Sequence, residues 1–291
     1  MRTLVMKSSL PRPLSCIVFT VSSSFSSSHA PSASRVSFKE IQNNKHGLSY
    51  ELDATMREGH HDMKTFGLGF LRSISSIEHQ AHTLASLHAP YAAMEGCLYQ
   101  AVREKKNTKL ERFWSKIGQD VEKSDSLKED VDMLGGNKLP IPSGDRYAAA
   151  ILKAAENRCQ NDDPGSEGDL LLAHIYVRYL ADLFGGSMLG KPSELALGLP
   201  TNSLKFYIPN NGPHEQMIKH HKILFIEMFY DELNKCGLEM TAERRQQVVQ
   251  EAKDAFRYNA DVFTEREGFV PGAVQGGCKL VGGYLRNFLS L

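Results

Sequence analysis

Hydrophobic side chains recur at helical spacing through most of the chain beyond residue 47, and the two-residue alternation typical of strands is scarce. The run 77–104 is the clearest case, since Ala85, Tyr91, Met94, Leu98 and Val102 follow one another at that spacing. Similar patterns predict helices at 51–65, 107–134, 145–158, 168–189, 214–236 and 241–266. Glycine and proline in 135–143 and 200–213 predict loops. We therefore expect an all-α, single-domain fold.

The end of the chain carries further local signals. Thr241, with Glu243 two residues on, predicts the start of the helix at 241–266. The tail 267–291 holds six glycines together with large apolar residues, and Lys279 and Arg286 make it a poor membrane anchor. We expect it to be a packed terminal segment. The sequence contains no uncharged apolar run of about 18 residues, so a membrane span is not expected.

The first 45 residues differ in composition, and we expect a disordered organelle-targeting segment ahead of a domain at 46–291. Residues 1–39 contain no acidic residue, and twelve of the first 38 residues are serine. A serine-rich, acid-poor, weakly basic N-terminus is typical of a transit peptide, which predicts a plastid first and a mitochondrion second. The apolar stretch 14–21 also fits a signal peptide, and a plain disordered tail is the remaining alternative.

Composition excludes several classes of protein. The chain has 34 basic and 34 acidic residues, and this balance argues against nucleic-acid binding, which usually needs a basic excess. Five widely spaced cysteines without a CxxC pair argue against a disulfide scaffold or a cysteine-rich zinc site. A mixed-charge globular protein remains.

Two adjacent glycines, Gly185 and Gly186, stand inside the predicted helix 168–189. Each glycine in a helix interior costs about 1 kcal/mol relative to alanine, so a structural or functional reason is expected. The usual reasons are a kink in the helix or the close approach of a partner that a side chain would block, either a flat, bulky ligand or another helix. Arg178 and Asp182 precede the pair and lie four residues apart, where they can form an ion pair.

Three blocks of sequence carry a family resemblance. LLLAHIYVRYLADLFGGSMLG, at 170–190, resembles the distal-helix signature of heme oxygenases, whose usual form is close to LLVAHAYTRYLGDLSGGQ. The segment 239–263, with the pattern AFxxNxxxF, resembles the last core helix of that family, and LASLHAPYAAME, at 84–95, resembles the helix with a pocket tyrosine. The resemblance covers about 50–290 and implies a helical bundle with a heme slot between a proximal and a glycine-kinked distal helix.

The resemblance also implies a chemistry: heme is opened to biliverdin with release of carbon monoxide and iron, and ferredoxin is the expected electron donor. On the distal side it assigns a water-holding catalytic network, with Asp182 anchoring the water that delivers a proton. The network comprises Tyr91, Arg178, Asp182 and Asn259. The expected heme contacts are Tyr176, Ala181 (in place of a family glycine), Gly185, Gly186, Phe256 and Phe263.

The proximal iron ligand depends on the register. In one register Arg57 and Glu58 match the proximal helix of the family, and His60 falls on the ligand position. In a rival register Lys64 stands there, and histidine ligation is lost. The spacing to Phe66 favours His60, although adjacent histidines on a surface helix are often simply solvated. The resemblance places His174 at a position that is not the iron ligand, so a packing role is expected. His79, His82 and His88 form one cluster and His220 and His221 another, and neither carries an acid at metal-ligand spacing.

Other positions depart from the family pattern. Lysine and arginine usually pair with the heme carboxylates, yet the matching segment 225–235 offers Glu227 and Asp231. Arg57, Lys219 or Lys222 would have to substitute, and 127–136 has no tyrosine where one is usual. Two functions therefore stay open: a plastid heme oxygenase, or an inactive relative that acts as a binding or scaffold factor with a protein partner in the plastid. A diiron protein is disfavoured because paired ExxH motifs are absent.

Overall fold

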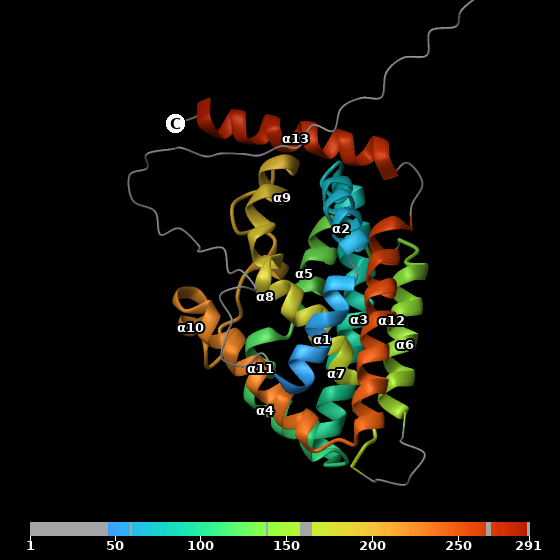
Figure 1. Cartoon of the computed structure of the whole chain (residues 1–291). Coiled ribbons are helices and arrows are strands. Elements are labelled where there is room, and N and C mark those ends of the chain that lie inside the picture. Colours follow the sequence, from blue (N-terminus) through green and yellow to red (C-terminus); the bar gives the residue numbers. More distant parts are fainter. Residues whose placement is uncertain (1–45, 59, 138, 158–164, 266–268, 290–291) are drawn as a thin grey trace, which may run out of the picture. The chain divides into compact units, whose positions relative to one another are not determined.

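The computed structural model describes residues 46–58, 60–137, 139–157, 165–265 and 269–289, and leaves the side chains of 56–64 outside the description (Figure 1). Within these ranges every regular element is helical, which confirms the all-α prediction. The longer helices are α1 (Gly47–Glu58), α2 (His60–Ser73), α3 (Ile77–Glu104), α4 (Thr108–Val121), α5 (Ser124–Leu134), α6 (Pro142–Glu156), α9 (Gly190–Leu197), α11 (Lys222–Leu238), α12 (Ala242–Thr264) and α13 (Phe269–Leu289). The predicted targeting segment 1–45 lies outside the described residues.

Helix α3 organises the bundle, since it packs against α4, α5 and α6 (Figure 1). The side chain of Ser76 caps its start by accepting the backbone N–H of His79 at 3.0 Å. At its other end Lys105 adopts a left-handed conformation, with φ of 52°, and its N–H closes the last turn on Ala101. The element matches the predicted range 77–104.

Several predicted helices are divided in two. The range 51–65 falls on α1 and α2, and 214–236 falls on α10 (Glu215–His220) and α11. The range 107–134 becomes α4 and α5 because a distant carboxylate caps the second helix. Glu95 of α3 accepts the backbone N–H groups of Lys123 at 2.6 Å and of Ser124 at 3.1 Å. A side chain 28 residues away thus ends one helix and starts the next.

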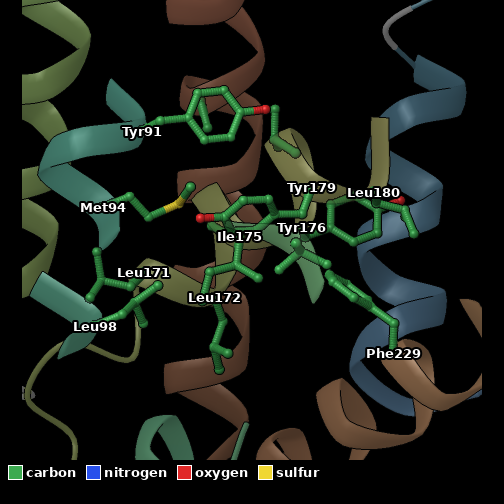
Figure 2. Packing of buried hydrophobic residues seen from close by; sticks show 14 of the residues in the cluster. Tyr91, Met94, Leu98, Leu171, Leu172, Ile175, Tyr176, Tyr179, Leu180 and Phe229 are labelled. Atoms are coloured by element: carbon green, nitrogen blue, oxygen red, sulfur yellow. The ribbon is translucent and has the colours of Figure 1, made fainter. Parts of the chain in front are cut away.

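The hydrophobic core lies between α3 and the segment 171–188 and extends to α11. Tyr91, Met94 and Leu98 project from α3 toward the region of Leu171, Ile175 and Tyr179 (Figure 2). The rings of Tyr91 and Tyr179 are 5.5 Å apart, and all of these side chains are buried. The core therefore fixes one side of the glycine-containing segment against α3.

The C-terminal helices complete the domain. Thr241 caps α12 as predicted, because its side chain accepts the N–H of Arg244 at 3.2 Å. Helix α12 packs against α2, α6 and α7 (Leu171–Ile175). Helix α13 packs against α2 and α9, which confirms that the tail is a packed segment (Figure 1).

Candidate functional site

The predicted helix 168–189 is not one regular helix. It begins as α7, continues as a π-helical turn, η1 (Tyr176–Leu180), and returns to α-helix in α8 (Ala181–Phe184). A 3₁₀ turn, η2 (Gly186–Met188), follows. π-Helical turns are rare in proteins, and those that occur are often at functional sites. The wider turn redirects the side chains that follow it. The segment is therefore interrupted twice, once before Ala181 and once at Gly185.

At Gly185 one face of this segment has no described side chain against it. Ala181 is exposed, and Phe184 and Gly185 are partly exposed. A Cβ atom built on Gly185 would meet no described atom within 4 Å, whereas one on Gly186 would lie 2.9 Å from Oδ1 of Asp182 in the same segment. Packing against another helix therefore does not explain the glycine pair within the part of the chain that the structure describes. The pair lies where the helix is interrupted, so a kink is one explanation, and the space beside Gly185 that holds no described atom is compatible with a ligand as another.

The four residues predicted to form the distal network do come together. The Tyr91 hydroxyl of α3 donates to Oδ2 of Asp182 and accepts from Nη2 of Arg178 at 3.0 Å. Nη1 of Arg178 donates to Oδ1 of Asn259 on α12. Nη2 of Arg178 also lies 4.0 Å from Oδ1 of Asp182, which is the expected contact between residues four apart. Helices α3 and α12 thus meet the segment 176–184 at Arg178, which contacts both Tyr91 and Asn259.

Burial sets the electrostatics of this network. Desolvation raises the pKa of Asp182, and the charge of Arg178 and the Tyr91 hydrogen bond oppose that rise only in part. Desolvation also raises the pKa of Tyr91 well above its usual value, so its hydroxyl stays protonated. Asp182 consequently takes up a proton more readily than an exposed aspartate does, next to a neutral phenol and a fixed guanidinium.

A second polar cluster, which the sequence interpretation missed, supports the first. The Tyr179 hydroxyl donates to Oε1 of Glu95 at 2.9 Å, the same carboxylate that caps α5. Burial raises the pKa of Glu95. The signal was present, because Glu95 lies one helical turn after Tyr91 and Tyr179 directly follows Arg178. This cluster ties the network to the start of α5.

A small cavity of about 40 Å³ adjoins the carboxyl of Asp182. Lys123 and Lys222 are among its lining residues, together with Gly186, Ser187 and Tyr207. Nζ of Lys222 donates to the Ser187 hydroxyl at 3.1 Å, and burial lowers the pKa of this lysine. Nζ of Lys123 donates to the Ile208 carbonyl at 2.9 Å. The cavity has the polar partners that an ordered water needs.

The predicted aromatic contacts occupy different surroundings. Phe263 of α12 is partly buried, and its ring packs edge-on against Phe66 of α2, with centroids 5.7 Å apart. Phe256 is partly buried and packs against the hydrophobic core. Tyr176 is buried, and its hydroxyl donates to Oδ1 of Asp53 at 2.7 Å. That these three residues contact heme stays a prediction.

Asp53 is a second residue that the sequence interpretation missed. Its buried carboxylate accepts the hydroxyls of Tyr176 and Tyr230 at 2.7 and 2.8 Å. Burial raises the pKa of Tyr230, and the nearby Asp53 charge adds to that rise. No local motif indicates this cluster, because its members are 123 and 177 residues apart in the chain.

Three of the residues considered for the heme carboxylates, Asp231, Lys219 and Lys222, have partners within the protein. Asp231 pairs with Lys235 at 2.6 Å, and Glu227 is partly buried one turn earlier on α11. Lys219 pairs with Glu215. Part of the acidic charge at 225–235 is therefore engaged in a surface ion pair, which is an ordinary structural role.

His60 and Lys64 both lie in α2, but their side chains are outside the described residues, as is that of Arg57. The choice between the two registers stays a prediction. His174 is fully buried with Nε2 3.0 Å from Oε1 of Glu251, and His82 bonds the Pro140 carbonyl at 3.0 Å. Among the residues that the structure describes, no group of three potential metal ligands is found. The packing role expected for His174 is confirmed.

Comparison with known proteins places these features in context. A sequence model of the heme oxygenase family matches residues 38–265. Heme oxygenase 2 of Synechocystis is 29% identical over 215 residues, which is 70% of this chain and 76% of that protein. Heme oxygenase 1 of Bos taurus is 39% identical over 108 residues, or 36% of this chain. That match spans only 34% of the bovine protein.

Solved structures show the same fold. The heme-free crystal structure of heme oxygenase 2 from Chlamydomonas reinhardtii superposes with a TM-score of 0.62 at 17% identity, covering 75% of this chain and 97% of that one. Heme oxygenase-2 of Synechocystis, in complex with heme and NO, gives 0.60 at 23% identity, covering 82% and 93%. At these identities the likeness establishes the architecture of the bundle.

Proposed function

This chain belongs to the heme oxygenase family, and we propose that it opens heme oxidatively to biliverdin, releasing carbon monoxide and iron. One observation carries the proposal: the buried network of Tyr91, Arg178, Asp182 and Asn259 stands next to the open face at Gly185. Heme, when bound, would supply the iron and the ring at which oxygen reacts. The protein has to bind it, shield it and manage the protons.

Asp182 is the residue that handles the proton. Burial raises its pKa above that of an exposed aspartate, which favours the protonated carboxyl that general acid catalysis requires. Tyr91 fixes Oδ2 by donating a hydrogen bond, and Arg178 is held in turn by Asn259. The carboxyl therefore has one orientation before the substrate arrives, which reduces the reorganisation needed during reaction.

The residues on the open face suit a flat ligand. Gly185 adds no side chain to that face, and Ala181 adds one methyl group to an exposed position. Both residues were expected to contact heme, and the space above Gly185 supports that expectation. We propose that His60, the first residue of α2, ligates the iron from the opposite side.

A heme titration of the full chain tests the proposal. We expect a Soret band typical of histidine ligation, which is lost in His60→Ala and retained in Lys64→Ala. His220→Ala, which removes an exposed histidine from α10, is the matched control and should leave the band unchanged. Adding a reductant under air should then convert the wild-type band to biliverdin.

Each other outcome has a definite meaning. The absence of a Soret shift at micromolar heme would refute heme binding and with it the enzyme. A band that persists without forming biliverdin would leave the binding or scaffold role. Loss of the band in Lys64→Ala, with His60→Ala unaffected, would establish the rival register.

We also propose that residues 1–45 direct the chain to a plastid, where ferredoxin would supply the electrons. The support is compositional: the segment is rich in serine and contains a single acidic residue, Glu40. A fusion of residues 1–45 to a fluorescent protein should accumulate in plastids of a plastid-bearing cell. Accumulation in mitochondria or the cytosol would contradict the proposal.

A further inference from the structure

Helix α13 is seated on the domain by its glycines. A Cβ atom on Gly276 would lie 1.6 Å from the Leu71 carbonyl oxygen of α2, and one on Gly283 would lie 2.4 Å from the Leu195 carbonyl oxygen of α9. Distances this short leave no room for any side chain, so the backbones are in direct contact. The face of α13 that touches the domain is therefore a glycine face.

The large apolar side chains of α13 point elsewhere. Val270, Val274, Val281, Leu285 and Phe288 are 62, 63, 61, 57 and 70% exposed. Their spacings of 4, 7, 4 and 3 residues place them within an arc of about 60° on a helix that turns about 100° per residue. A continuous apolar stripe thus runs almost the length of the helix. We call these five side chains the α13 stripe.

The charged side chains of α13 and the exposed charged side chain of α9 are of one sign. Phe269 to Leu291 contains no acidic residue, and Lys279 and Arg286 are its only charged side chains. On the supporting helix α9, Lys191 is exposed, whereas Glu194 is buried and accepts the Leu204 N–H at 3.2 Å. An apolar stripe with lysine and arginine on the remaining surface is the pattern of helices that lie in a membrane interface.

We propose that α13 docks this protein onto the surface of an anionic lipid bilayer, with the stripe inserted at the boundary between headgroups and acyl chains. In the part of the chain that is described, no helix is long and apolar enough to cross a bilayer. Basic residues without exposed acids in α9 and α13 complement anionic headgroups, which attract them near the surface. This role is independent of heme chemistry.

A bilayer suits the stripe better than a second copy of the chain does. A stable dimer buries about 800 Å² on each partner in a contact that spans several elements, whereas the exposed apolar side chains here lie on one face of a single helix. A second copy would also bring another set of bases, with no exposed acid on α9 or α13 to pair with them. The bilayer provides both the apolar depth and the opposite charge.

Vesicle sedimentation with the full chain tests the proposal. Wild type should bind vesicles of phosphatidylglycerol and phosphatidylcholine more strongly than pure phosphatidylcholine vesicles. Val274→Ser combined with Val281→Ser and Phe288→Ser should weaken that binding by more than about tenfold, because three large apolar groups no longer enter the bilayer. Lys191→Gln with Lys279→Gln and Arg286→Gln should abolish the preference for anionic vesicles.

A matched control separates the stripe from general apolar exposure. Leu152→Ser with Met133→Ser and Leu238→Ser removes side chains that are 49, 49 and 81% exposed on other helices, and it should bind vesicles as wild type does. Residues 1–45 are the same in every variant, so a difference reports α13. Equal binding by wild type and the stripe variant, or no binding by wild type, would refute the proposal. Light scattering that shows a dimer lost in the stripe variant, without vesicle binding, would assign the stripe to a second copy.

Discussion

Asp182 accepts a hydrogen bond from the Tyr91 hydroxyl, and its Oδ1 lies 4.0 Å from Nη2 of Arg178. Burial raises the pKa of this carboxyl group. If it delivers the proton, Asp182→Asn should lower the rate of biliverdin formation by about 10² to 10⁴, because an amide keeps the shape but cannot supply the proton. Heme affinity should change little, since the amide oxygen still accepts from Tyr91. Soret titration and biliverdin absorbance measure the two quantities separately.

The control for this variant is Asp145→Asn, which changes an exposed aspartate of α6. Asp145 is not part of the proposed site, so its loss should leave both heme affinity and rate unchanged. A rate for Asp182→Asn equal to that of the control would show that the proton takes another route. Thermal unfolding of both variants checks that the loss of charge beside Arg178 has not disrupted the fold.

Glycine shows why residue identity alone does not predict a role. A side chain on Gly185 would meet no described atom, one on Gly186 would meet Asp182 of the same segment, and one on Gly276 would meet the backbone of α2. In the sequence all three are simply glycines in helical patterns, and both a ligand and close packing explain them. Only the position of the neighbouring backbone separates these cases, and that position depends on residues far away in the chain.

Among the helices, periodicity predicted the bounds of α3 and α12 well. In each of them apolar residues recur at helical spacing over many turns, and a side chain caps the first turn. Periodicity failed where the cause is not local. Glu95 divides α4 from α5 by capping from another helix, and the π-helical turn at Tyr176–Leu180 leaves no mark on an apolar pattern. Boundaries set by tertiary hydrogen bonds cannot be read from periodicity.

Asp130 of α5 provides a test of one such tertiary hydrogen bond. It accepts the backbone N–H groups of Lys205 and Phe206 at 2.7 and 2.8 Å and so fixes η3 (Lys205–Tyr207) beside the cavity. Burial raises its pKa from 3.8 to about 6. The folded state then binds the proton more tightly than the unfolded state, so this group stabilises most below pH 4 and loses that contribution as pH rises through 6.

The measurement is urea unfolding from pH 4 to pH 7. The free energy of unfolding of wild type relative to Asp130→Asn should fall by about 1 to 2 kcal/mol across that range, because the asparagine stays neutral. Asp132→Asn, exposed on the same helix, should give a constant difference. A constant or rising difference for Asp130→Asn would mean that its carboxylate is not buried.

At the scale of the whole domain, the distal network was predicted from a family resemblance and not from the local physical properties of its residues. Tyr91, Arg178 and Asn259 lie on three separate segments, and nothing in their local patterns requires them to meet. The Asp53 cluster was missed for the same reason, because no motif marked it. The stripe on α13 was visible only as apolar composition until the structure showed which face the glycines bury.

The two proposals combine in one further prediction. Helix α13 contacts the C-terminal end of α2 at Leu71 and Arg72, and the proposed iron ligand His60 is the first residue of the same helix, so docking by the stripe would bring the proposed heme site within about 20 Å of the bilayer-facing helix. Heme is a flat, largely apolar molecule that partitions into lipid, and a docked protein would encounter it at high local concentration. We therefore expect the stripe to speed the uptake of heme from membranes without changing the affinity of the slot.

Heme transfer from anionic vesicles checks this expectation. The stripe variant should acquire the Soret band from heme-loaded vesicles several-fold more slowly than wild type, because uptake then depends on chance collisions rather than on docking. When albumin supplies the heme in a vesicle-free solution, the two proteins should load at the same rate, which shows that the slot is intact in the variant. Equal rates from vesicles would mean that the slot takes heme from water and that docking serves another purpose. Slower loading from both sources would indicate instead that the substitutions disturb α2 through its contact with α13.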